Sequence, residues 1–238
     1  MTAFGQRLRQ VSWASVLALA ALIAPGCGGG GDAPQQAANP AAGPGNGPGG
    51  GAGRIDAALA AIAPQPLSAL EASGLQFMRE EEQLAREVYR RSAALWPDWP
   101  LFDNIAASEA THTAAVKQLL DRYQLVDPLA GVVDGELASP VFRGLLAQLA
   151  QASARGVKDA LAVGAEIEEL DLRDLREALA ASDNADIAWV YDSLQRGSRN
   201  HLRSFMRALL AQGGQYIPKY LSQAEFDSIV NSPMETGP

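Results

Sequence analysis

Residues 104–115 have the sequence N-I-A-A-S-E-A-T-H-T-A-A, an alanine-rich stretch without glycine or proline that is typical of a helix. Glu109 and His112 are three residues apart, so both side chains lie on one face of that helix, one turn from each other. The same face continues in apolar residues such as Ile105 and Val116. A carboxylate and an imidazole are therefore predicted to face the core, where an ion without a partner is strongly destabilising.

The chain around this stretch is predicted to be all-α, because alternating runs of β-branched residues are lacking and Ala, Leu, Glu and Arg are abundant. Capping boxes, prolines and glycines mark the helix ends. The expected long helices are Ser68 to about Trp96, with a break near Gly74, then about 103–123, 157–181 and 184–211. Shorter helices are expected at about 139–154 and 223–230, and the segment Tyr216–Val230 is expected to pack back on the bundle. This pattern predicts one four-helix bundle over residues 66–238.

Each of the other long helices also has polar side chains at inward positions. Six groups are predicted to face the core: Glu81, Glu109, His112, Glu168, Asp171 and His201. Three neighbouring acids are expected to point to solvent instead: Glu80, Glu82 and Glu169. The two histidines of this sequence are thus both assigned to the core.

The charges of these groups suggest how they are balanced. Taken singly, an inward histidine is more often a hydrogen-bonded core residue, and an inward glutamate usually meets an arginine. Here the arginines and lysines of the four helices project away from the inward faces, except Lys117 at an edge. Two divalent ions would balance four carboxylates, and four carboxylates with two imidazoles are the ligand set of di-iron and di-manganese bundles. The sequence therefore predicts a metal site, with iron favoured and manganese or zinc as alternatives.

Four separate blocks resemble one known family in the same order: Phe77–Tyr89, Asn104–Ala115, Val163–Leu172 and Gly197–Phe205. They are similar to the domain-of-unknown-function 2202 family, a ferritin-like family of bacteria and archaea with no established activity. The resemblance covers about residues 66–230 and implies a ferritin-like up-down four-helix bundle. Related bundles place a glutamate three residues before the second histidine, where this chain has Ser198. Asp171 could supply that carboxylate, so we expect two ions, or one if the second position stays empty.

Two classes of function follow from such a site. The first is a redox-active di-iron centre that oxidises Fe(II) with oxygen or peroxide. The second is a non-catalytic module that sequesters or senses metal or uses it as a structural staple. A scaffold that binds no metal is a third and weaker alternative.

The N-terminal residues predict export. Residues 1–27 combine Arg7 and Arg9 with an apolar stretch too short for a membrane span, which is typical of a signal peptide. Small residues precede Cys27, as in a bacterial lipobox, so we expect lipidation of Cys27 and a membrane-anchored protein of the cell envelope. Simple secretion with a free thiol is the alternative. Residues 28–65 are expected to form a disordered Gly/Ala/Pro-rich linker.

The charge balance bears on the partners. Removal of Arg7 and Arg9 leaves 17 of the 19 basic residues against 27 acidic ones, a formal charge of −10. Such a chain is compatible with cation binding and argues against nucleic acid as a partner. A homodimer is compatible with the sequence.

Overall fold

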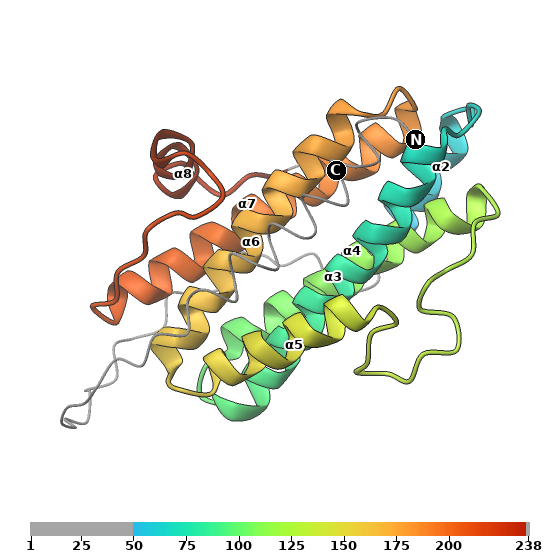
Figure 1. Ribbon diagram of the computed structural model, residues 1–238. Helices are drawn as coiled ribbons and strands as arrows, with labels where there is room; N and C mark the ends of the chain where they lie inside the picture. The colour runs from blue at the N-terminus through green and yellow to red at the C-terminus, as the bar shows by residue number, and fades with distance from the viewer. Residues whose placement is uncertain (1–49, 237–238) are drawn as a thin grey trace.

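The computed structural model describes residues 50–236, with side chains from residue 55, and this part of the chain consists of helices and their connections (Figure 1). The helices are α2 (Gly50–Ala61), α3 (Ala69–Leu95), α4 (Pro100–Arg122), α5 (Pro140–Ser153), α6 (Val157–Ala180), α7 (Ala185–Ala211) and α8 (Gln223–Val230). The predicted all-α class is confirmed, and α8 has the predicted bounds.

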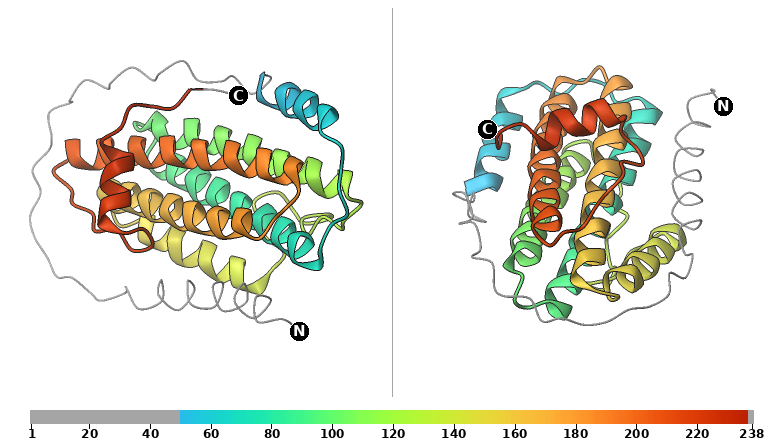
Figure 2. Two further views of the ribbon diagram at one scale, coloured as in Figure 1. Left: turned by 90° about the horizontal axis from the view of Figure 1, so that it is seen from above. Right: turned by 90° about the vertical axis from the view of Figure 1, so that its left-hand side faces the viewer.

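The long helices α3, α4, α6 and α7 form a four-helix bundle (Figures 1 and 2). The pairs α3 with α4 and α6 with α7 are antiparallel neighbours and make the most extensive contacts. Between these pairs, a loop and α5 carry the chain back along the bundle, so that α4 and α6 run in the same direction. Helix α5 covers α3 and α6, and α8 packs against α7. The ferritin-like bundle expected from the sequence is therefore confirmed.

Local sequence signals explain where these helices begin and end. The Ser68 hydroxyl accepts a hydrogen bond from the Glu71 N–H at 3.1 Å, and the Glu71 carboxylate accepts one from the Ser68 N–H at 2.9 Å. This reciprocal capping box satisfies two N–H groups that α3 leaves unpaired. Helix α7 ends before Gly213, whose φ of +66° is a left-handed conformation that favours glycine.

The apolar core is divided into two clusters by a layer of polar side chains. One cluster contains Leu84 and Val88 of α3 together with Phe205 of α7. The other contains Leu75 of α3 and Val190 of α7. On each of the four long helices the candidate metal ligands lie between the residues of these two clusters. The ligands therefore meet halfway along the bundle.

Two expectations about the first helical segments were wrong. Helix α3 runs without a break through Gly74. Residues 50–61, expected within a disordered linker, form α2, because Ile55 and Leu59 lie one turn apart and are buried against the second apolar cluster. Arg122 holds the end of α2 by donating to the carbonyl of Leu59 at 2.7 Å.

The remaining N-terminal predictions, the signal peptide at 1–27, lipidation of Cys27 and the linker at 28–49, lie outside the described residues. Among the helices that the structure describes, none is long and apolar enough to cross a membrane.

Candidate metal centre

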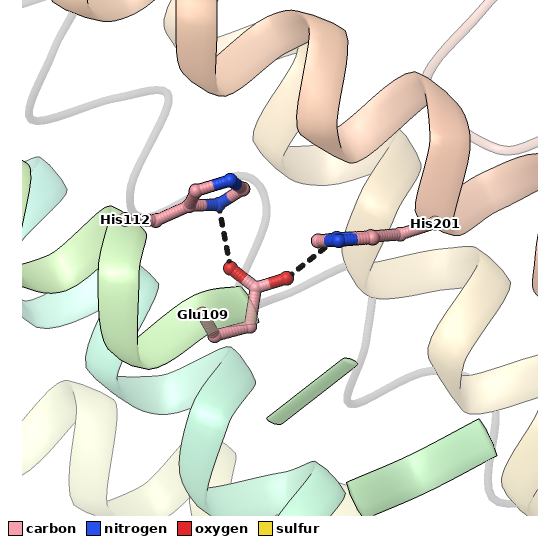
Figure 3. A group of neighbouring side chains, drawn as sticks. All are labelled: Glu109, His112 and His201. Atoms are coloured by element: carbon pink, nitrogen blue, oxygen red, sulfur yellow. Dashed lines mark ion pairs between the residues drawn. The ribbon is translucent and has the colours of Figure 1, made fainter. Parts of the chain in front are cut away.

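Glu109 lies at the middle of the polar layer, between the two histidines (Figure 3). Its Oε2 is 2.8 Å from Nδ1 of His112, one turn further along α4. Its Oε1 is 2.7 Å from Nδ1 of His201, which comes from α7. The ligand atoms of these three buried residues all lie within 4.8 Å of one another. The i, i+3 spacing predicted from the sequence thus brings one carboxylate against both imidazoles.

The two imidazole rings are held in a fixed relation. Their centroids are 5.4 Å apart with 27° between the ring planes. Ser108 lies 2.9 Å from Nε2 of His201 and can accept a hydrogen bond from its N–H. This contact fixes the ring orientation in which Nδ1 faces Glu109. Ser108 was not identified from the sequence, where a serine beside an expected ligand carries no distinctive signal.

Helix α6 brings Glu168 and Asp171 to the same layer. Oε2 of Glu168 is 3.5 Å from Nδ1 of His201, and its Oε1 accepts a hydrogen bond of 2.6 Å from the Tyr89 hydroxyl. Asp171 accepts a hydrogen bond from Ser198 of α7. The carboxylate of Asp171 therefore faces the α7 position where related bundles have a glutamate.

On α3, the residue beside the histidines is Glu82, which was wrongly expected to face solvent. Glu82 is 1% exposed, and its Oε2 lies 3.2 Å from Nδ1 of His112. Glu81 is also buried, but it forms a hydrogen bond with Asp174, which pairs with Arg173 at 2.6 Å. The centre thus draws its α3 carboxylate from Glu82, with Glu81 at its edge.

The other expectations of solvent exposure were wrong as well. Glu80 is buried because the segment before α5 crosses it, and it accepts a hydrogen bond of 2.8 Å from the Ser139 N–H. Glu169 is fully buried beneath the segment before α8, where it accepts hydrogen bonds from the Tyr216 hydroxyl and from the Leu221 N–H. The prediction assumed that α3 and α6 each have one buried face. The segment before α5 covers a second face of α3, and the segment before α8 covers a second face of α6.

The carboxylates of the layer resist ionisation in different degrees. Burial, opposed in part by His112, raises the pKa of Glu82 to about 8. Burial and the neighbouring carboxylates Glu82 and Glu168 raise the pKa of Asp171 well above its usual value. Burial acts on Glu109 in the same way, but His112 and His201 outweigh it and lower the pKa of Glu109. Glu109 is therefore the carboxylate that the histidines keep ionised.

The histidines respond to the same charges in the opposite sense. Burial disfavours the charged imidazole, but Glu109 and Glu168 outweigh it and raise the pKa of His201 to about 9. Burial is likewise outweighed at His112, where Glu109 and Glu82 raise the pKa well above its ordinary value. Without a metal ion, the layer is thus held together partly by protons on its histidines and carboxylates.

The donor set fits a metal ion. Several buried ligand atoms make no hydrogen bond of acceptable geometry: Oε2 of Glu81, Oε1 of Glu82, both oxygens of Glu109, Oδ1 of Asp171 and Nδ1 of His201. The arginines and lysines of the described residues form ion pairs with acids outside this set, such as Arg79 with Asp127, Arg173 with Asp174 and Lys219 with Glu166. Buried carboxylate oxygens and imidazole nitrogens, gathered around Glu109, His112 and His201, are the donor types that iron, manganese or zinc would bind.

Comparisons with known proteins agree with this architecture. The profile of a family described as "Uncharacterized protein domain (DUF2202)" matches residues 71–233. "Uncharacterized protein MJ0754" of Methanocaldococcus jannaschii is 43% identical over 181 residues, which cover 75% of this chain and 96% of the relative. A crystal structure of the hypothetical protein MJ0754 superposes with a TM-score of 0.71, covering 73% of this chain and 99% of that one. The chain therefore belongs to the DUF2202 family.

Proposed function

We propose that this protein binds two metal ions, preferably iron, in the polar layer of its bundle and oxidises Fe(II) there. The observation that carries the proposal is the position of Glu109, whose two oxygens face Nδ1 of His112 and Nδ1 of His201. A carboxylate with one oxygen towards each of two imidazoles is placed to bridge two ions.

The other carboxylates divide between the two halves of such a centre. Glu82 lies beside His112, which gives one half Glu82, Glu109 and His112. Glu168 lies beside His201, and Asp171, which accepts a hydrogen bond from Ser198 of α7, is the further carboxylate assigned to this half. Each half then holds carboxylates and one imidazole, a set that suits Fe(II) and also manganese or zinc.

Iron bound there supplies one-electron redox chemistry. Two Fe(II) ions give up one electron each, and hydrogen peroxide with two protons accepts both electrons and becomes two water molecules. The protein would hold the ligands in place for this reaction: Tyr89 donates a hydrogen bond to Glu168, and Ser108 is within hydrogen-bond distance of Nε2 of His201. The apolar clusters on both sides of the layer exclude bulk water.

One observation favours a second function, metal used as a structural staple. The candidate ligands come from all four long helices, so bound ions would link α3, α4, α6 and α7 at their midpoints. A sequestering or sensing module would use the same property. In this alternative the centre binds ions stoichiometrically and turns over no oxidant. Anchoring to the cell envelope through Cys27 stays a prediction from the sequence.

The experiment that decides is metal analysis of the purified protein, followed by anaerobic loading with Fe(II) and exposure to air or hydrogen peroxide. Repeated Fe(II) oxidation supports the redox function, and stoichiometric binding without turnover supports the staple. We expect Glu109→Ala and His112→Ala to abolish metal binding and to leave the helical circular dichroism unchanged. Glu80→Gln is the matched control, because Glu80 is an equally buried α3 carboxylate that bonds a backbone N–H instead of facing the centre. Full metal binding by both Ala variants would refute the assignment.

A further inference from the structure

A small cavity reaches the metal centre from the side of α5. Its volume is about 10 Å³, which is about the space that the centre of one water-sized molecule needs. Glu82, Glu109, Glu168 and Asp171 line its inner end. Neither His112 nor His201 lines it. The cavity therefore meets the carboxylate face of the centre.

The walls of the cavity between the centre and α5 are apolar. Leu84 and Ala85 of α3, Leu145 and Leu149 of α5, and Ile167 and Leu170 of α6 form them. All six are buried, with at most 7% of each exposed. Two further acidic residues line the cavity: Glu81, which forms a hydrogen bond with Asp174, and Glu166, whose Oε2 is 2.5 Å from Nζ of Lys219. Loss of hydration along such walls would cost an ion far more free energy than it would cost a small uncharged molecule.

Helix α5 is the outer wall of this cavity. Leu145 and Leu149 lie one turn apart on the face of α5 that packs against α3 and α6. Figure 2 shows α5 beside the four-helix bundle rather than within it. A molecule that crosses between α5 and the bundle therefore passes these two leucines before it meets a carboxylate.

We infer that this cavity admits a small uncharged oxidant, of the size of dioxygen or hydrogen peroxide, to the carboxylate face of the centre. Leu145 and Leu149 set its size limit. The inference rests on the proposed function, because it names the class of oxidant for the same centre. Organic hydroperoxides and other organic substrates are excluded, since the cavity has room for about one water-sized molecule.

Leu149→Ala tests the size limit in the full-length protein loaded with Fe(II). Its matched control is Leu146→Ala, because Leu146 is a buried leucine of α5 that does not line the cavity. The rate of Fe(II) oxidation by tert-butyl hydroperoxide is divided by the rate with hydrogen peroxide. We expect Leu149→Ala to raise this ratio about tenfold or more, the size of effect that small changes in an apolar pocket produce, and Leu146→Ala to leave it unchanged.

Leu149→Phe and Leu145→Phe test access without turnover. Nitric oxide, an uncharged diatomic probe, is mixed with the Fe(II)-loaded protein, and its binding is followed by absorbance. We expect both variants to slow nitric oxide binding about tenfold while the affinity for Fe(II) stays that of the unaltered protein.

Equal ratios for the two Ala variants, or nitric oxide rates that do not depend on either Phe substitution, would refute the role of the cavity in admitting the oxidant. The assignment of the metal site would be unaffected. Failure of the unaltered protein to bind Fe(II) would refute the proposed function, and with it the role of the cavity in admitting an oxidant.

Discussion

Gly197→Ala is expected to displace one ligand of the metal centre without unfolding the bundle. Gly197 lies in α7, and a Cβ added there would be 2.4 Å from Nε2 of His112 and 2.5 Å from its Cε1. Ordinary van der Waals contact begins at 3.4 Å, so the ring must move by about 3.4 − 2.4 = 1.0 Å. Metal–ligand distances tolerate about 0.2 Å, one fifth of that shift. The absence of a side chain at Gly197 therefore lets His112 reach Glu109.

The fold should tolerate this substitution because the ring of His112 is the far end of a side chain and can rotate. Alanine is also favoured over glycine within a helix by about 1 kcal/mol. We expect the affinity for Mn(II) or Fe(II), measured by calorimetric titration, to fall at least 10- to 100-fold, the cost typical of disturbing groups that orient a ligand. The melting temperature of the metal-free protein should change little.

Gly144→Ala is the control for the backbone effect. Gly144 is an exposed residue of α5, and an added Cβ would meet nothing within 4 Å. This variant should be stabilised by about 0.5–1 kcal/mol and bind metal normally. If Gly197→Ala binds metal as tightly as Gly144→Ala, the reasoning that His112 needs this space is refuted.

Three further predictions test the layer and its surroundings. Glu82→Gln should weaken metal binding by tenfold or more and Glu81→Gln by much less, because Glu82 lies beside His112. Equal losses of metal affinity in titrations of the two variants would contradict the assignment of Glu82. The folded-state pKa of Glu82, about 8, exceeds its ordinary 4.5, and that of His201, about 9, exceeds 6.5. Their protons therefore stabilise the metal-free fold at low pH. The free energy of unfolding of the metal-free protein, measured in urea, should fall from pH 5 to pH 9, and a free energy that rises over this range would contradict the prediction. Glu169→Gln should lower the free energy of unfolding by about 1–3 kcal/mol, since the half-buried Tyr216 hydroxyl and the N–H groups of Lys219, Tyr220 and Leu221 lose a carboxylate acceptor; a change below about 0.5 kcal/mol would show that the contact is dispensable.

The sequence predicted the bundle well because its signals are local. The capping boxes at Ser68 and Ser222 and the Gly213 stop act within one or two turns, and each is found in the structure. The i, i+3 pair Glu109 and His112 was also placed correctly in the core, since that spacing depends on helix geometry alone.

The errors arose where another segment covers a helix. Projection of α3 gave one inward face centred on Glu81, but the segment before α5 buries Glu80, and Glu82 faces His112 of α4. Glu169 is buried in the same way by a segment about 50 residues further along the chain. Such contacts depend on tertiary packing, which the period of a single helix does not encode.

The polar layer also has a consequence for how the molecule unfolds. Because it separates the two apolar clusters, each end of the bundle has a core of its own, and the metal-free layer joins the ends through charged groups that burial disfavours. Backbone amides near Leu75 and near Phe205 should then exchange hydrogen for deuterium in two separate cooperative units. Bound metal ions would join these units, so that the protein unfolds as a single cooperative unit only when metal occupies its centre.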